Sequence, residues 1–160
     1  HGDLHPGNCI IDKEGKFVFI DNGAICHAPE FVNRSLFKFF EHLSKQELDE
    51  AFIALLDMTN QKPTGKKMQK YMNKMGEIYF DFEKKPVGEQ SLTRVMMQTV
   101  RAAVELANAE FGEEAFPIIR ALMYLDGLVI RTHPDAMLIK SMGPYLDEFK
   151  FKLGLETALV

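Results

Sequence analysis

Several residue types and patterns are scarce in this sequence, and each absence narrows the classes of function. It has no tryptophan and only two cysteines, Cys9 and Cys26, which fit no metal-binding or redox spacing. Two free thiols in a reducing compartment are the simplest interpretation. No apolar run approaches the ~20 residues that a membrane-spanning helix needs, and no signal peptide is visible. The formal net charge of −4 gives no reason to expect nucleic-acid binding.

The rest of the composition suits a folded domain. The 160 residues are 46% hydrophobic and 26% charged, a balance typical of a globular unit with a real core. No internal repeat, low-complexity tract or linker divides the chain. We therefore expect residues 1–160 to form one domain.

The most informative stretch is the N-terminal run His1-Gly2-Asp3-Leu4-His5-Pro6-Gly7-Asn8, followed by Phe19-Ile20-Asp21-Asn22-Gly23. Asp3 and Asn8 have the D-x-x-x-x-N spacing of a phosphotransferase catalytic loop, and Asp21 stands where kinases carry the metal-binding aspartate. Carboxylate and amide oxygens suit a hard cation such as Mg²⁺. The pattern predicts Asp3 as the catalytic base, with Asn8 and Asp21 binding Mg²⁺ and the nucleotide phosphates.

A β-hairpin is expected between these two segments. Cys9 to Ile11 forms a short apolar strand, residues 12–15 form a turn that ends in glycine, and residues 16–20 form the return strand. The outer ends of a hairpin lie close together, so Asn8 and Asp21 should meet at the same end. His1, His5, Pro6, Gly7 and Gly23 are expected to shape or brace these loops rather than to do chemistry.

About six helices are expected after the hairpin, from the spacing of apolar residues. Ser44 and Glu47 have the spacing of a capping box, Ser91 is a second candidate cap, and Gly112 should end a helix. Asp126, His133 and Asp135 are expected to serve helix ends. The expected ranges are Ala28 to Leu43, Gln46 to Met58, Lys66 to Phe82, Leu92 to Phe111, Glu113 to Arg131 and Asp135 to Leu153. The expected fold class is α+β, mostly α.

The N-terminal run resembles the H-x-D-x-H-P-G-N loop of the UbiB-type atypical kinases, the ubiquinone-biosynthesis family. It also resembles the H-G-D-x-H-x-x-N loop of aminoglycoside and choline phosphotransferases. The segments Phe116 to Leu128, His133-Pro134-Asp135 and Gly143-Pro144-Tyr145-Leu146 are similar to the UbiB-type C-terminal pattern and favour that family. Leu4 and Asn22 depart from the proline and phenylalanine that many members carry.

The resemblance implies a kinase-like large (C-terminal) lobe and an atypical kinase or ATPase that uses ATP and Mg²⁺ in isoprenoid quinone (ubiquinone) biosynthesis or lipid handling. Expected partners are the nucleotide, an anionic membrane or isoprenoid lipid intermediates, and quinone-biosynthesis proteins. The expected location is cytoplasmic and membrane-associated in a bacterium, or mitochondrial or plastid in a eukaryote. The grouped lysines Lys66, Lys67, Lys70 and Lys74 could contact such a membrane or form an ordinary solvated helix face.

The chain supplies neither a phosphate-covering loop nor a nucleotide-pairing lysine. We therefore expect a fragment without its small lobe, inactive alone, whose hairpin exposes apolar residues near Ile10, Phe17 and Phe19. Two other functions stay open. A small-molecule phosphotransferase of the aminoglycoside/choline type needs an acidic pocket, whereas Glu41, Glu47, Asp49 and Glu50 are scattered. A catalytically inactive pseudokinase scaffold would fit Asn22 but not the intact Asp3, Asn8 and Asp21.

Overall fold

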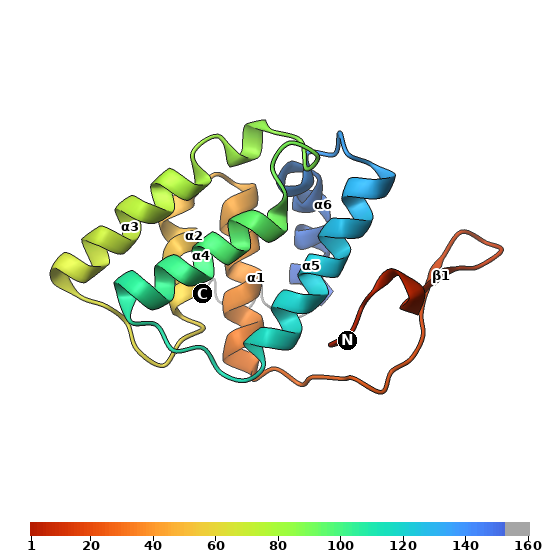
Figure 1. Cartoon of the computed structure of the whole chain (residues 1–160), viewed down its shortest axis with the longest axis horizontal. Helices are drawn as coiled ribbons and strands as arrows, with labels where there is room; N and C mark the ends of the chain where they lie inside the picture. Colours follow the sequence, from red (N-terminus) through yellow and green to blue (C-terminus); the bar gives the residue numbers. More distant parts are fainter. Residues whose placement is uncertain (153–160) are drawn as a thin grey trace.

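The structure is a computed structural model that describes residues 1–152. A short 3₁₀ helix, η1 (Pro6–Asn8), leads into the antiparallel strands β1 (Cys9–Ile11) and β2 (Phe17–Phe19). The helices that follow are α1 (Glu30–Ser44), α2 (Leu48–Leu56), α3 (Gly65–Tyr79), α4 (Leu92–Ala107), α5 (Ala115–Thr132) and α6 (Leu138–Lys152), with a second 3₁₀ helix, η2 (Phe82–Lys84), after α3 (Figure 1). The expected class, α+β and mostly α with a hairpin before the helices, is confirmed.

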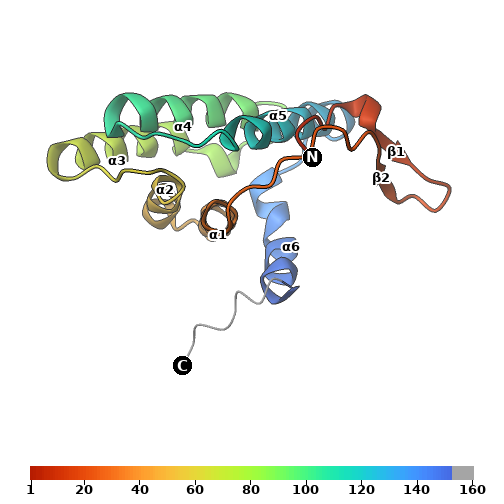
Figure 2. The same ribbon diagram turned by 90° about the horizontal axis from the view of Figure 1, so that it is seen from below.

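The helices form two layers. Helices α3, α4 and α5 lie in one layer, and α1 and α2 lie in the other. Helix α6 starts near α5 and runs away from the layer of α3, α4 and α5 (Figure 2). The hairpin projects beyond α5, far from the α3 end of the molecule (Figures 1 and 2). The N-terminal segment therefore lies next to α5 although more than a hundred residues separate them in sequence.

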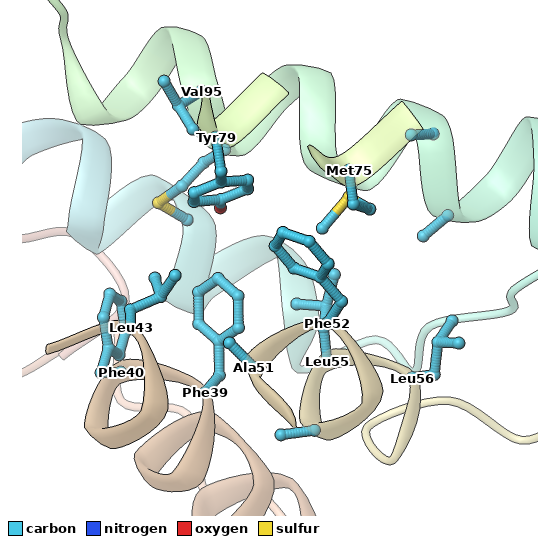
Figure 3. Packing of buried hydrophobic residues seen from close by; sticks show 14 of the residues in the cluster. Phe39, Phe40, Leu43, Ala51, Phe52, Leu55, Leu56, Met75, Tyr79 and Val95 are labelled. Carbon is cyan, nitrogen blue, oxygen red and sulfur yellow. The ribbon is translucent and has the colours of Figure 1, made fainter. Parts of the chain in front are cut away.

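The core lies between the two layers. Aromatic rings from α1, α2 and α3 meet there, and Phe52 and Tyr79 stand 5.3 Å apart between ring centroids (Figure 3). Two tyrosine hydroxyls are satisfied inside this apolar core. Tyr71 donates to the Phe52 carbonyl oxygen at 3.0 Å, and Tyr79 accepts from Thr99 at 3.0 Å. Burial raises the pKa of both phenols, so they remain neutral donors or acceptors.

The predicted capping box is wrong. Ser44 is the last residue of α1, and its hydroxyl donates to the Glu41 carbonyl oxygen at 2.7 Å. Glu47, at the start of α2, makes no side-chain cap; its carboxylate contacts the His42 ring at 2.6 Å. The chain turns sharply at Gln46, whose φ is 64°, and this left-handed residue separates the two helices.

Gly112 does not end α4, which is shorter than predicted. The helix ends at Ala107 because Asn108 adopts the left-handed conformation, with φ 54° and ψ 35°, and donates its N–H to the Ala103 carbonyl oxygen. Ser91 does cap α4 and accepts from the Arg94 N–H, as predicted. Phe111 lies outside the helix and forms an isolated bridge with Thr59.

The other helix boundaries differ by a few residues. Helix α3 ends at Tyr79, just before the left-handed Asp81, and α6 begins at Leu138 rather than at Asp135. The expected end of that last helix, Leu153, lies outside the described residues. Helix α5 stops at Thr132, one residue after the expected end at Arg131.

The hairpin exposes its apolar side chains to solvent. Ile11 is 63% exposed, Phe17 is 59% exposed, and Ile10 and Phe19 are each about half exposed. The expected apolar patch is therefore confirmed. Cys9 and Cys26 are both free thiols, also as expected. None of the described helices is long and apolar enough to cross a bilayer.

A buried carboxylate joins α1 to α6. Glu41 is largely buried, and it accepts from Lys45 at 2.7 Å within α1 and from Lys150 of α6 at 3.1 Å. Burial alone would raise the pKa of Glu41, but the hydrogen bonds and charges of Lys45 and Lys150 outweigh it and lower this pKa below the ordinary glutamate value. The ionised form therefore holds the C-terminal helix against the first helix.

This lowered pKa predicts a loss of stability in acid. A group whose pKa is lower in the folded state contributes stability above its unfolded pKa, near 4.3, and loses it as the pH falls through the folded value. We expect Glu41→Gln to lower the thermal midpoint by about 2–4 °C at pH 7 and by less at pH 3. Thermal unfolding at both pH values, beside Glu50→Gln on the exposed face of α2, measures this difference. An equal loss at the two pH values would contradict it.

Candidate active site

The first eight residues form a compact loop built around η1. His5 caps this 3₁₀ turn, and its ring Nδ1 accepts the Gly7 N–H at 3.0 Å. The Asn8 N–H donates to the His5 carbonyl oxygen at 2.8 Å. Pro6 suits the first position of the turn because its missing N–H would have no partner there. The structure thus gives His5, Pro6 and Gly7 contacts that shape the turn before Asn8.

Asn8 is buried and oriented by the loop itself. The residue is 6% exposed, and its side-chain Nδ2 donates to the Asp3 carbonyl oxygen at 2.9 Å. The amide nitrogen is therefore engaged inside the loop, and Oδ1 is the end of the side chain that could bind a cation. The same bond ties Asn8 to Asp3, the partly buried residue predicted as the base.

The loop is joined directly to the segment that carries Asp21. The Ile20 N–H donates to the Asn8 carbonyl oxygen at 2.9 Å, and the Gly2 N–H donates to the Ala24 carbonyl oxygen at 2.6 Å. His1 adds a side-chain link, because its Nε2 lies 3.1 Å from the Ile20 carbonyl oxygen and its Nδ1 accepts the Asp3 N–H at 3.3 Å. A neutral imidazole protonated at Nε2 satisfies both contacts. The two predicted segments are thus adjacent.

Asp21 has an unusual backbone conformation. Its φ is 57°, in the left-handed region that glycine, asparagine and aspartate adopt more readily than other residues. Its side chain is exposed, and Oδ1 accepts a long hydrogen bond of 3.4 Å from the Gly23 N–H. Gln46 and Asn108 adopt the same left-handed conformation where the chain turns at helix ends. The left-handed turn at Asp21 therefore shapes the loop that carries its side chain.

The oxygen donors here fit Mg²⁺. Asn8 offers one amide oxygen and Asp21 one carboxylate, and Mg²⁺ commonly takes one or two protein ligands and completes its shell with water and phosphate oxygens. Within residues 1–152, no group of three or more His, Cys, Asp and Glu side chains is placed to hold a metal ion. A cation here would therefore rely on a bound polyphosphate for its remaining ligands.

Helix α5 contributes residues that the sequence did not single out as functional. Arg120 donates its Nε–H to the Gly2 carbonyl oxygen at 2.7 Å. One turn further along, Tyr124 contacts the His5 ring edge-on, with 6.0 Å between the centroids. No local pattern could have revealed these contacts, because they join residues 118 and 119 positions apart. The only signal is the spacing of 120 and 124 on one helix face.

The remaining acidic residues of the hairpin serve its turn. Asp12 Oδ1 accepts the backbone N–H groups of Glu14 and Lys16, both at 2.8 Å. Gly15 completes the turn with φ 80°. These contacts agree with the expectation that Asp12 and Glu14 are turn residues, so they do not add to the cation site.

An apolar cavity lies in the helical region, away from this loop. It has a volume of about 50 Å³ and is lined mainly by apolar side chains of α1, α4 and α5, with contributions from α2, Tyr79 and Phe111. Part of the lining falls in residues 66–111, where a lipid-handling role would predict a groove. The volume is well below the ~150 Å³ of a cavity that holds benzene. This cavity is too small for an isoprenoid chain. A separate open groove of about 850 Å³ lies between α3 and α4 and is lined by both charged and apolar side chains of residues 74–106.

Comparisons with known proteins agree with the kinase-like interpretation of the N-terminal loop. Residues 1–54 match the family model of the ABC1 atypical kinase-like domain. The chain is 21% identical over 172 residues to the "Probable protein kinase UbiB" of Blochmanniella pennsylvanica, and 23% identical over 175 residues to that of Sodalis glossinidius. Each alignment covers 99% of this chain and 30% of the relative. No solved structure matches.

A third relative, an uncharacterised protein of Synechocystis, is 21% identical over 90% of the chain and 25% of its own length. The chain thus spans about 30% of the two UbiB relatives. The family model covers the loop, the hairpin and Asp21, and the alignments extend through the helices. The arrangement of a hairpin followed by helices fits the ABC1 atypical kinase-like domain. These matches confirm the resemblance of the chain to the UbiB-type atypical kinase-like proteins.

Proposed function

We propose that this chain carries the catalytic loop and metal-binding loop of an ATP- and Mg²⁺-dependent atypical kinase or ATPase of the UbiB type. The observation that carries the proposal is the direct connection between the two loops. The contacts of Asn8 and His1 with Ile20 bring Asp3, Asn8 and Asp21 to one end of the hairpin. Phosphoryl transfer depends mainly on such positioning and on charge neutralisation.

Each residue has a distinct role in this proposal. Asp3 orients the acceptor hydroxyl or a water molecule and takes its proton. Asn8 and Asp21 would hold Mg²⁺, and the bound ion supplies positive charge against the phosphates of ATP. His1 and His5 keep the loop in shape through their ring nitrogens. Asn22 stands where a phenylalanine would pack in many kinases, so activation by movement of that side chain is not part of the proposal.

The proposed biological role is the synthesis of isoprenoid quinones such as ubiquinone, or the handling of related lipids. It rests on the resemblance to the UbiB-type proteins. Peripheral contact with an anionic membrane would use the lysines of α3, whose side chains are exposed. One of them, Lys74, pairs with Glu77 at 2.7 Å, as on an ordinary solvated helix face. Quinone-biosynthesis proteins, and a cytoplasmic, mitochondrial or plastid membrane, are the corresponding partners and locations.

The small-molecule phosphotransferase is less well supported. A cationic antibiotic or choline would need a cluster of carboxylates, but the candidates are already engaged elsewhere. Glu41 binds Lys45 and Lys150, and Glu47 binds His42. Asp49 and Glu50 lie exposed in the first turn of α2. These four carboxylates therefore do not form an acidic pocket beside the loop.

The test is Mg²⁺-dependent ATP turnover by the full-length protein, with and without anionic liposomes. A panel of acceptors that includes kanamycin and choline is run beside it, with Asp21→Ala as the inactive control. Turnover that rises with liposomes, is lost in Asp21→Ala and is unaffected by the panel supports the UbiB-type proposal.

The other outcomes separate the alternatives. Turnover that depends on kanamycin or choline would favour the small-molecule phosphotransferase. Absence of both turnover and nucleotide binding would favour a scaffold without catalytic activity.

A further inference from the structure

We propose that Arg120 of α5 is a positioning residue that holds the loop carrying Asp3 in its working conformation. The inference rests on the proposed function, because it assigns Arg120 a part in the same reaction. Arg120 donates its Nε–H to the carbonyl oxygen of Gly2, the residue directly before Asp3, at 2.7 Å. The bond spans 118 positions of sequence and links the helical body to the loop.

Both polar groups of the Gly2 backbone are engaged by other parts of the chain. The N–H donates to Ala24, just after the Asp21 segment, at 2.6 Å, and the carbonyl oxygen accepts from Arg120. Gly2 therefore links three segments: the catalytic loop, the metal-binding loop and α5. The views of the whole chain agree, since the N-terminal segment runs alongside α5 in both (Figures 1 and 2).

The packing at Gly2 leaves little room for movement. A Cβ atom at this position would lie 3.2 Å from the Ala24 carbonyl oxygen, 3.3 Å from the Pro117 Cβ and 3.8 Å from Arg120 Nη2. Pro117 and Arg120 are three residues apart, on the same face of α5. This face therefore contacts the loop through both packing and a hydrogen bond, and a third contact follows one turn later, where Tyr124 meets His5.

The position of the Asp3 backbone therefore depends on α5. The carbonyl group that Arg120 holds belongs to the peptide unit whose nitrogen is that of Asp3. Rotation of this peptide would move the Asp3 backbone away from His1 Nδ1, which accepts the Asp3 N–H. The nucleotide phosphates would be held by other residues, Asn8 and Asp21. Loss of the Arg120 bond should therefore impair the chemical step more than the binding of ATP.

Two substitutions separate the hydrogen bond from charge and bulk. In Arg120→Gln, the amide nitrogen stands at the same number of bonds from the backbone as Nε, so a donor remains while the charge is lost. In Arg120→Met, a methyl group takes that place and the donor is lost as well. Arg131→Met, in the exposed last turn of the same helix, is the matched control.

The first measurement is amide hydrogen exchange at residues 2–8 in the full-length protein. We expect Arg120→Met to speed exchange of the Gly2 and Asp3 amides by about tenfold or more, because the loop opens more often. Arg120→Gln should stay near the wild type, and so should Arg131→Met. Unchanged exchange in Arg120→Met, or equal acceleration in the Gln and Met variants, overturns the proposal.

The second measurement is ATP turnover by the same proteins. We expect kcat to fall by about 10- to 100-fold in Arg120→Met, with the KM for ATP unchanged, and to recover in Arg120→Gln. A KM that rises while kcat stays constant would overturn the positioning role. If the wild type has no turnover, the proposed function fails, and the exchange data still decide whether Arg120 holds the loop.

Discussion

Replacing Asp21 by asparagine is expected to reduce Mg²⁺-dependent ATP turnover by at least about 100-fold. The substitution keeps the size of the side chain and an oxygen that can accept from Gly23, but it removes the negative charge that would hold the cation. Asparagine also tolerates the left-handed backbone that Asp21 adopts at φ 57°. The loop should therefore keep its shape, and the loss should appear as a weaker apparent affinity for Mg²⁺ together with a lower kcat.

Asp12→Asn provides the matched control for this prediction. Asp12 lies in the same hairpin and accepts two backbone N–H groups through one oxygen, which an asparagine side chain can also do. It has no part in the proposed cation site. Equal losses in the two variants would indicate damage to the hairpin rather than loss of a ligand. Full turnover and unchanged Mg²⁺ dependence in Asp21→Asn would remove Asp21 from the site.

The proximity of these residues could be anticipated because it depends on local geometry. Asn8 and Asp21 flank a short hairpin, and the outer ends of a hairpin must be close whatever the rest of the fold does. The expected bracing by His1 also depends on nearby chain, since its partner Ile20 belongs to the return segment of the hairpin. By contrast, the contact between Arg120 and Gly2 depends on how α5 packs, and the spacing of residues 120 and 124 shows only that they share a helix face.

The helix ends show the same difference between features set by local sequence and features set by tertiary packing. The apolar spacing located all six α-helices of residues 1–152, but two of the predicted end signals were misplaced. Ser44 matched a capping box, yet its hydroxyl turns back to Glu41 within α1, and Gln46 makes the turn instead. Asn108 ends α4 in the left-handed conformation four residues before the predicted Gly112. Several residues near each end could adopt these conformations, and tertiary packing selects among them.

Asp126 was expected to stabilise a helix end. It lies within α5 but stabilises the N-terminal end of α4. The residue is 3% exposed, and its carboxylate accepts from the Ser91 hydroxyl at 2.7 Å, the Leu92 N–H at 3.1 Å and the Thr93 N–H at 2.9 Å. These groups form the N-terminus of α4, where the helix dipole favours a negative charge. Helix α5 thus stabilises α4 with one face, while another face contacts the N-terminal loop through Arg120 and Tyr124.

Asp126→Ala is expected to lower the free energy of unfolding by about 3 kcal/mol, because a buried and a partly buried N–H group lose a charged acceptor. Ser91→Ala should cost about 1 kcal/mol, the usual value of a lost N-cap. The double variant should cost less than the sum of the two single variants, since the carboxylate and the hydroxyl contact each other.

Urea unfolding measures the free energy of unfolding of each variant. Asp135→Ala, at an exposed position, is the control and should change this free energy little. Additive costs would show that Ser91 and Asp126 act independently. A cost for Asp126→Ala no larger than for Asp135→Ala would show that the carboxylate does not stabilise the start of α4. Helix α5 carries both Asp126 and Arg120, the residue that binds the Gly2 carbonyl oxygen. If the prediction holds, we therefore attribute any loss of activity in Asp126 variants to the lost stabilisation between α5 and α4.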